Sequence, residues 1–523
     1  MLKHLVSSIA LIAVWLAALP PEQARAADAK TAPANTAATL IYYDMAGNET
    51  LDPAEPQNNS TYSHEALLAI YDTLIRLDDA GTPGPGLAQS WTRNDDLTTM
   101  TLKLRPGVKF HDGTAFNAEA VRRNFARSAA LGRRAGGTMF ETFALIEAVE
   151  VQGEDTVTLR LKSPSGQIEY WLASTPGMMI SPAALTEGAM GATLAAIGAG
   201  PYRLKSFDAN VSTILVRNDA YWGGTEGRPA GFQHHYVPDG RARLNALRSG
   251  QANIALIDQR QIPEAKSAGL TIQIVEKNAL WVMFPNLKKG PLGDLRIRHA
   301  IMHAIDREAL AEALSFGSAH ATQQLWSSQS PFFVKELEGR YAFDQNKARA
   351  LMAEAGYKDG FEMTQLLLNN SEYRQISEAL QANLAEVGIK LKFDVVDVSQ
   401  FTQFFKPPPR GDILMGRYGG RSDPIQTVYE LVGTGGSYTP GGSASPRIDD
   451  LLNQARRLAA SNPRRVEVMR DLAREISDTA ASIPIISRAN IYAYNPGCIQ
   501  NLTPYLPAGD DRFNDVRIGG GCK

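Results

Sequence analysis

Residues 102–114 read LKLRPGVKFHDGT, and their pattern describes a strand that runs into two closely spaced turns. Between Met100 and Leu104 apolar side chains alternate with polar ones, as in a half-buried β-strand. The pairs Pro106-Gly107 and Asp112-Gly113 are typical of turns. Phe110 lies between the two turns and is available to be buried. We therefore interpret this segment as part of the protein's framework rather than as a binding site.

Further elements follow on both sides of this segment. Val157, Leu159 and Leu161 alternate with polar residues and predict a second half-buried antiparallel strand. Asn117 can cap a helix whose apolar residues share one face, and Leu40–Tyr43 reads as a first strand.

The second half of the chain has a different character. Apolar residues at helical spacing predict helices around Ile297–Ile305, Ala348–Ala355, Ile376–Val387, Ile448–Ala455 and Met469–Ile476. Gly356 and Gly388 end two of these helices, and Ile389–Val395 then alternates like a strand. Helix, glycine and strand in this order favour an α/β fold. Ile483–Ser487 then reads as an extended segment that crosses back to the first lobe.

Length and charge set limits on function. The 523 residues, 44% of them hydrophobic, suffice for two or three lobes. The 53 basic and 55 acidic residues give a net charge of −2, so nothing indicates a nucleic-acid partner or an attraction to a membrane surface.

Residues 1–26 predict a cleaved signal peptide. Lys3 supplies the positive charge, Leu5–Leu19 the apolar core and Ala24–Ala26 the small residues at the cleavage site. The apolar run is short for a membrane span. No cysteine follows the cleavage site, so we expect a periplasmic protein without a lipid anchor.

The chain has only two cysteines, Cys498 and Cys522. An oxidising compartment favours a disulfide between them, which we expect. The alternative is two unpaired thiols.

Common catalytic signatures are absent from the sequence. It contains no G-x-S-x-G, H-E-x-x-H, C-x-x-C or Gly-Lys dipeptide. His299 and His303 are spaced to share a metal on one helix face, but the buried stripe of that helix favours a structural role. The adjacent His234 and His235 would point to opposite faces of a strand. We expect no metal, no cofactor and no catalytic residues.

Several segments in order along the chain resemble the family 5 extracellular solute-binding proteins of ABC importers, the group of oligopeptide, dipeptide and nickel-chelate binders. The resemblance rests on residues 87–91 (LAQSW), 102–114, 200–202 (GPY), 217–222 (RNDAYW), 296–301 (RIRHAI), 304–307 (AIDR) and 353–357 (AEAGY).

This resemblance implies a bilobal α/β periplasmic-binding-protein fold of the large three-domain type. Lobe I would be discontinuous, lobe II would be one segment, and an extra domain would pack on lobe I. The boundaries implied are 38–59, 200–276 and 488–523 for lobe I, 60–199 for the extra domain and 277–487 for lobe II. Two crossing segments, near Asn278–Phe284 and Ile483–Asn490, would form a hinge, and ligand would bind between the lobes.

The candidate ligand loop is Met415–Pro424, which reads MGRYGGRSDP. Peptide-binding relatives carry here an acidic residue that holds the peptide's amino terminus, whereas this chain has Gly420. The planar guanidinium groups of Arg417 and Arg421 can each donate two hydrogen bonds to a carboxylate or phosphate, so we expect an acidic solute. In the alternative, Arg421 pairs with Asp423 and only holds the loop. The expected ligand-contacting residues are Arg417, Tyr418, Gly419, Arg421, Asp423, Trp281, Asn286, Tyr43 and Trp326.

The favoured function is therefore a monomeric periplasmic binder that captures a peptide-like or other polar, acidic small solute. Its partners would be that small molecule and the permease and ATPase of an ABC importer. A ligand sensor for a membrane receptor stays open as an alternative. A periplasmic hydrolase on the same scaffold is a weaker one, because the sequence shows no nucleophile, base and oxyanion set.

Overall fold

The structure is a computed structural model that describes residues 34–55, 64–135, 137–185, 195–397, 400, 404, 409–421, 423–439, 442–503, 505–506, 513 and 515–522. The predicted signal peptide lies outside the described residues. No described helix is long and apolar enough to cross a membrane.

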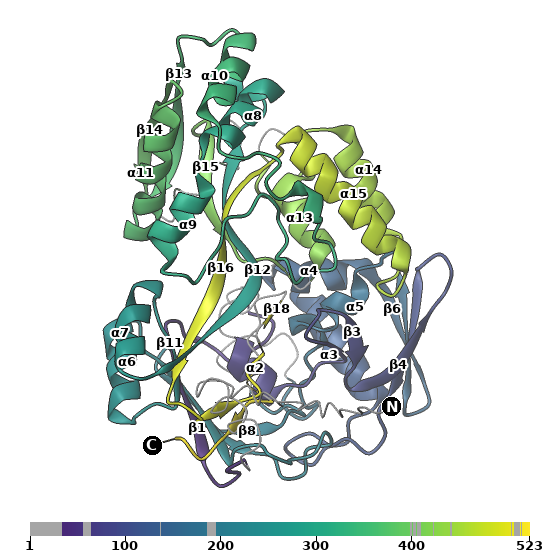
Figure 1. The fold of residues 1–523 in the computed structure, drawn as a ribbon. Coiled ribbons are helices and arrows are strands. Elements are labelled where there is room, and N and C mark those ends of the chain that lie inside the picture. The colour runs from purple at the N-terminus through teal and green to yellow at the C-terminus, as the bar shows by residue number, and fades with distance from the viewer. Residues whose placement is uncertain are drawn as a thin grey trace, which may run out of the picture.

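One long mixed sheet runs through most of the molecule in the order β14-β13-β15-β12-β16-β11-β1-β10-β9-β8, with β18 paired to β12 (Figure 1). Its strands are β1 (Thr39–Asp44), β8 (Tyr202–Asp208), β9 (Ser212–Arg217), β10 (Gly231–Tyr236), β11 (Ile254–Leu256), β12 (Thr271–Pro285), β13 (Phe361–Leu368), β14 (Ile389–Val396), β15 (Ile413–Tyr418), β16 (Ile483–Tyr494) and β18 (Tyr505–Leu506). We call the part with β1 and β8 to β11 lobe I and the part with β13 to β15 lobe II. The residue boundaries given above for the lobes stay a prediction.

The two longest strands, β12 and β16, connect the lobes. They pair antiparallel from Thr271 opposite Tyr494 to Met283 opposite Ile483. The register shifts between Glu276 and Ala279 and again at Trp281 and Val282. Figure 1 shows both strands rising together from lobe I into lobe II.

Helices cover both faces of the sheet in lobe II, which explains why β13 and β15 are rich in apolar residues. One core packs beneath α8, α10 and α11 and the other beneath α13, α14 and α15. The helices are α8 (Leu295–Ala304), α9 (Arg307–Ser315), α10 (Gln345–Glu354), α11 (Ser371–Ala385), α13 (Pro424–Val432), α14 (Pro446–Arg456) and α15 (Pro463–Thr479). The helices predicted in this half, and the strand after Gly388, are confirmed.

Lobe I is smaller. Its apolar residues form one core with α2 (His64–Ile70) and another with α6 (Gly240–Ser249) and α7 (Ile262–Ser267). The tail closes this lobe through the short strands β17 (Ile499–Gln500) and β19 (Arg517–Ile518). Cys498 and Cys522 form a disulfide across them.

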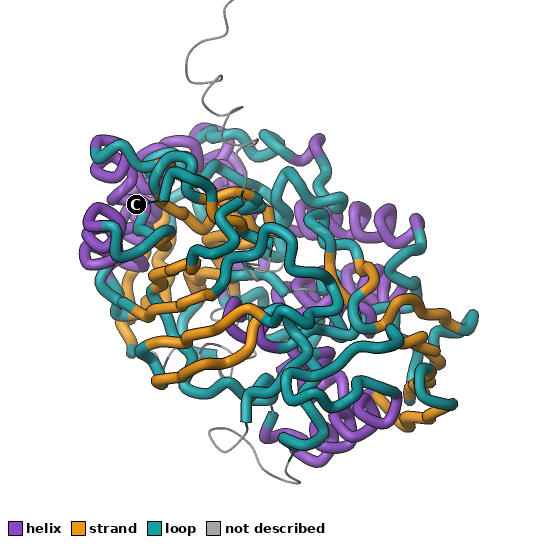
Figure 2. Tube along the Cα trace, turned by 90° about the horizontal axis from the view of Figure 1, so that it is seen from below, coloured by secondary structure: helices purple, strands orange, loops and turns teal. Residues whose placement is uncertain are grey.

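The extra domain is a separate four-stranded sheet in the order β4-β5-β7-β6, and Figure 2 shows its strands as a second group. Its elements are β4 (Ala88–Arg93), β5 (Thr99–Leu104), β6 (Ile146–Gln152), β7 (Thr156–Leu161), α3 (Ala118–Leu131), α4 (Gly137–Leu145) and α5 (Ile168–Trp171), with the hairpin β2 (Ile75–Leu77) and β3 (Pro83–Pro85) beside it.

Residues 102–114 adopt the predicted strand and turns. β5 pairs antiparallel with β7, Gly107 and Gly113 adopt positive φ, and Phe110 is buried. Asn117 caps α3 by accepting a hydrogen bond from Ala120 N at 3.0 Å. The strand β7 is more deeply buried than the half-burial expected from its alternation, because Thr156 and Thr158 are buried as well. Thr158 can be buried because its hydroxyl bonds that of Thr101 at 3.1 Å.

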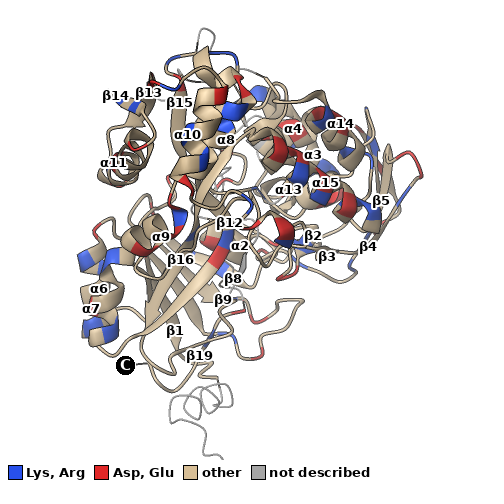
Figure 3. Ribbon diagram, turned by 45° about the horizontal axis from the view of Figure 1, so that its top comes forward, with Lys and Arg blue, Asp and Glu red and all other residues tan. Residues whose placement is uncertain are grey.

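Charged residues of both signs are interspersed on several outer helices, for example on α10, α14 and α15 (Figure 3). This agrees with the near-zero net charge and shows no field of one sign over those helices.

Candidate functional site

The carboxyl ends of the parallel strands of both lobes point toward the middle of β12 and β16. In lobe II, β15 ends at Tyr418, opposite Leu280 of β12. In lobe I, β11 ends at Leu256, opposite Tyr492 of β16. Ligands of open α/β sheets bind outside the carboxyl ends of the strands. A ligand site is therefore expected between the lobes, beside these two long strands.

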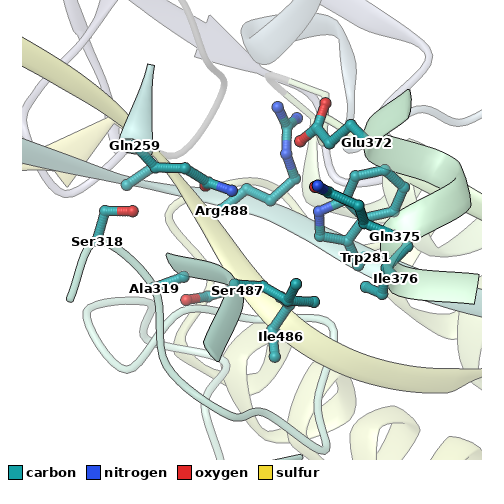
Figure 4. A pocket seen from close by; sticks show the side chains of 12 residues that line it. Gln259, Trp281, Ser318, Ala319, Glu372, Gln375, Ile376, Ile486, Ser487 and Arg488 are labelled. Atoms are coloured by element: carbon teal, nitrogen blue, oxygen red, sulfur yellow. The ribbon is translucent and has the colours of Figure 1, made fainter. Parts of the chain in front are cut away.

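A pocket lies at this position and takes residues from both lobes (Figure 4). Gln259 follows β11 of lobe I, Trp281 and Arg488 come from the two crossing strands, and Glu372 and Gln375 come from the first turns of α11 in lobe II. The empty space amounts to about 470 Å³, part of it open to solvent. A second pocket adjoins it through five shared residues, which are Ser318, Ala319, Ser487, Arg488 and Ala489.

Two of the predicted residues, Trp281 and Arg417, lie on this side of the lobe II sheet. They are directly opposite each other on β12 and β15. Both contact Tyr373: the Trp281 ring packs edge-on at 4.9 Å between ring centroids, and the Arg417 guanidinium lies 5.7 Å from the Tyr373 ring. Arg417 Nη1 also donates to Glu372 Oε2 at 3.0 Å. The positive charge of Arg417 is therefore already balanced.

Arg488 is a cation that the sequence prediction did not name. Its half-buried guanidinium lies 5.9 Å from the Trp281 ring and, in Figure 4, points toward the carboxylate of Glu372. Among the described residues it has no ion-pair or hydrogen-bond partner. A planar donor fork on the wall of a pocket can bind a carboxylate.

Tyr418 lies on the opposite side of the sheet, since neighbours on a strand face opposite ways. Arg421 follows the strand and lies on the same side as Tyr418, because both contact Glu430. The Tyr418 hydroxyl donates to Glu430 Oε2 at 3.0 Å, and burial together with that carboxylate raises the pKa of Tyr418. Arg421 Nε donates to both Glu430 oxygens at 3.0 and 3.1 Å. Burial lowers the pKa of Arg421, but Glu430 outweighs burial and raises it overall. Within the described part of the chain, neither terminal nitrogen of Arg421 donates a hydrogen bond.

Asp423 has a structural role in this arrangement. Its carboxylate caps α13 by accepting from Ile425 N at 3.0 Å and lies 3.6 Å from the Arg465 guanidinium. Gln167 of the extra domain also donates to it. Burial raises the pKa of Asp423 against the opposing effect of Arg465. The alternative in which Arg421 pairs with Asp423 is wrong, because each has a different charged partner, Glu430 and Arg465 respectively.

The remaining predicted residues lie apart from both groups. Gly419 directly follows β15 and leads into the Arg421 loop. Asn286 is buried beyond the far end of β12, where its side chain accepts from Lys288 N at 3.3 Å. Trp326 is buried in the core under α13 to α15, against Phe332. Tyr43 packs beside His235 in lobe I. The structure therefore does not bring these side chains to the pocket of Figure 4.

A contact between the extra domain and lobe II lies next to Arg421. Gln426 of α13 donates to Glu141 Oε2 of α4 at 2.8 Å. Burial first, and the nearby Glu430 carboxylate second, raise the pKa of Glu141 to about 7. The contact thus holds a carboxyl group that favours its protonated form.

This pKa shift predicts a pH-dependent stability. A carboxyl whose pKa is raised by folding stabilises the fold fully below its unfolded pKa, and this contribution is lost as pH rises through about 7. Glu141→Gln should therefore raise the melting temperature more at pH 8 than at pH 5. The difference should correspond to less than about 1 kcal/mol, because Glu141 remains partly exposed. Calorimetric melts of both proteins across this pH range test it, and an equal difference at both pH values would contradict it.

His299 and His303 each have a protein partner. His299 Nε2 lies 2.9 Å from Asp478 O and 3.1 Å from the Tyr341 hydroxyl, and His303 Nδ1 lies 2.8 Å from Ala342 O. Burial is the main cause that lowers the pKa of both. These contacts favour the structural role that the sequence suggested for the pair.

Comparison with known proteins agrees with the predicted resemblance. Residues 82–439 match the family model described as "Bacterial extracellular solute-binding proteins, family 5 Middle". The glutathione-binding protein GsiB of Pectobacterium atrosepticum is 29% identical over 355 residues, which cover 67% of this chain and 68% of the relative. GsiB of Escherichia coli O157:H7 is 30% identical over 359 residues, with the same two coverages.

Solved structures show the same fold. The crystal structure of NikA from Brucella suis in complex with Fe(III)-EDTA matches with a TM-score of 0.80 and 23% identity, over 92% of this chain and 99% of that one. The predicted fold class, a bilobal α/β periplasmic-binding-protein fold, is confirmed.

Proposed function

The chain belongs to the family 5 bacterial extracellular solute-binding proteins, and from this premise we propose that it captures an acidic, peptide-like small solute between its lobes in the periplasm. The loaded protein would deliver the solute unchanged to the permease and ATPase of an ABC importer. We further propose that it acts as a monomer and is not an enzyme. Its relatives are binding proteins, which supports the last point.

The observation that carries this proposal is the pocket of Figure 4. It takes its walls from lobe I, from lobe II and from the two strands that connect them. A solute in it would contact both lobes at once, so it would bind more tightly to a closed than to an open arrangement. Such a difference in affinity is what allows a ligand to select a closed state.

One arginine of the pocket supports an acidic solute. Arg488 has no charged partner among the described residues. Arg417, in contrast, is neutralised by Glu372. A carboxylate in the pocket would thus find a donor fork at Arg488. Glu372 adds a carboxylate that suits an ammonium group, and the name of the GsiB relatives makes glutathione, which carries both kinds of group, the first probe.

The test begins with mass spectrometry of solute released from the purified protein, followed by calorimetric titration with glutathione and with any solute so identified. Arg488→Ala should raise the dissociation constant at least tenfold, because a charge-assisted bond in a closed cleft is lost.

Arg374→Ala is the matched control. Arg374 is on α11, two residues from Glu372, but its side chain is half exposed, and its ion-pair partner among the described residues is Glu378. Its loss removes the same charge without touching the pocket, so binding should be unchanged. If Arg488→Ala binds the solute like the wild type, the acidic-solute proposal fails. If the pure protein consumes the solute, the transport proposal fails too.

A further inference from the structure

The extra domain meets lobe II where the segment before α5 packs against the end of α14 and the start of α15 (Figure 1). Gly166 N donates to Arg456 O at 2.6 Å, and Gly166 O accepts from Arg465 Nη1. Beside them, Gln167 Nε2 donates to the Asp423 carboxylate, which also lies 3.6 Å from Arg465. We call the contacts of Gly166 and Gln167 with Asp423, Arg456 and Arg465 the latch.

The latch is densely packed. Arg465 and Asp423 are each 1% exposed, and Gly166 and Gln167 are buried as well. A Cβ on Gly166 would overlap the carbonyl oxygen of Leu458 in lobe II. The φ of Gly166 is not positive, so the backbone angle would accept another residue. The close approach of the two chains is therefore what requires glycine, and a larger residue would hold the extra domain and lobe II apart.

The extra domain is also fixed to lobe I. Arg127 of α3 forms a buried ion pair with Asp52, which is next to Leu51 of the lobe I core. His111, which follows β5, has its Nε2 3.0 Å from the carbonyl oxygen of Gly200, just before β8. A rotation of lobe II about β12 and β16 would therefore leave the extra domain with lobe I and pull the latch apart.

We propose, on the basis of the closure that the proposed function requires, that the latch stabilises the closed arrangement of the two lobes. Its residues line neither the pocket of Figure 4 nor the pocket that adjoins it, so the latch acts whether or not a solute is bound. The affinity that a solute shows is reduced by the fraction of the protein that is not competent to bind it. The latch therefore raises affinity for the solute without touching it.

Gly166→Ala is the test variant and Gly84→Ala its matched control. Gly84 is on β3, in the hairpin beside the sheet of the extra domain. A Cβ there comes no closer than 3.9 Å to another part of the chain, at Arg76 O. Both variants gain one methyl group, but only Gly166→Ala places it inside the latch.

Closure is followed with a short bis-maleimide cross-linker between cysteines introduced at Ser163 and Arg457. Both positions are exposed, and they lie close to Gly166 and Leu458 respectively. The two native cysteines are joined to each other, so the reagent reacts only with the introduced pair. In protein dialysed free of solute, the cross-linked fraction should fall about tenfold or more in Gly166→Ala, because the methyl group overpacks the latch. It should be unchanged in Gly84→Ala.

Circular dichroism establishes that each variant is folded. Gln167→Ala is a second test variant in case Gly166→Ala does not fold, and it should lower the cross-linked fraction in the same direction. A folded Gly166→Ala that is cross-linked like the wild type would overturn the latch. If Gly166→Ala does not fold, a Gln167→Ala that is cross-linked like the wild type would do the same.

Calorimetric titration with glutathione separates the latch from the choice of solute. Glutathione should bind the wild type and Gly84→Ala equally, and Gly166→Ala about tenfold more weakly. If glutathione binds the wild type and Gly166→Ala equally, the latch does not control affinity and is overturned. If glutathione binds none of the proteins while the cross-linked fraction still falls in Gly166→Ala, the latch is supported and glutathione is excluded as the solute.

Discussion

Replacing Asp423 by alanine is expected to lower the free energy of unfolding by about 3 to 5 kcal/mol, the range for a buried ion pair that loses one partner. Asp423 and Arg465 are each only 1% exposed. Without the carboxylate, the Arg465 guanidinium stays buried with an uncompensated charge, and α13 loses its N-terminal cap. Urea unfolding followed by circular dichroism measures the change.

A double variant separates the charge effect from the loss of the cap. In Asp423→Ala with Arg465→Met, no uncompensated charge remains, so stability should recover to within about 1 to 2 kcal/mol of the wild type, the typical cost of a lost helix cap. A double variant that is as unstable as the single one would show that the pair's charge is not what matters.

Removing the disulfide is the second large expected effect. Cys498→Ser with Cys522→Ser should destabilise the protein by about 3 kcal/mol, because the bond closes a loop between residues 24 positions apart. This loop holds Phe513, which stacks on Tyr42 in the lobe I core at 4.5 Å. The loss should therefore appear first in lobe I, as faster amide hydrogen exchange along β1 and β10.

Reduction of the wild type should reproduce the effect of the double serine variant. Each single serine variant should also do so, since either one removes the bond. An unchanged urea midpoint in all of these proteins would contradict the prediction.

Much of the fold could be predicted from the sequence because the signals were local. Gly356 and Gly388 adopt positive φ and follow α10 and α11 closely, where helical periodicity and glycine together predicted the helix ends. The apolar pattern of this helix, which begins at Ile376, did not locate the start of α11 at Ser371. Asn370 caps it by accepting from Glu372 N at 2.9 Å, and an Asn-Ser-Glu sequence of this kind would have indicated the true beginning.

The site was harder to predict because its contacts are not local. Arg417 and Tyr418 were expected to serve one ligand, although adjacent strand residues point to opposite faces, and the structure separates them accordingly. Arg488 could have been found, since it lies in a segment already expected to form a hinge. Glu141 meets Gln426 across 285 positions, and no pattern in a single sequence reports such a contact.

The register shifts in β12 have a mechanical consequence. Paired strands bend most easily where their ladder is interrupted, and both interruptions lie between Glu276 and Val282, beside Trp281 and the partner strand's Arg488. The pocket of Figure 4 therefore lies near the pivot, whereas the contact of α4 with α13 joins the extra domain to lobe II. Groups near a pivot move least, so we expect Trp281 and Arg488 to stay in contact when the lobes open, while Glu141 and Gln426 separate.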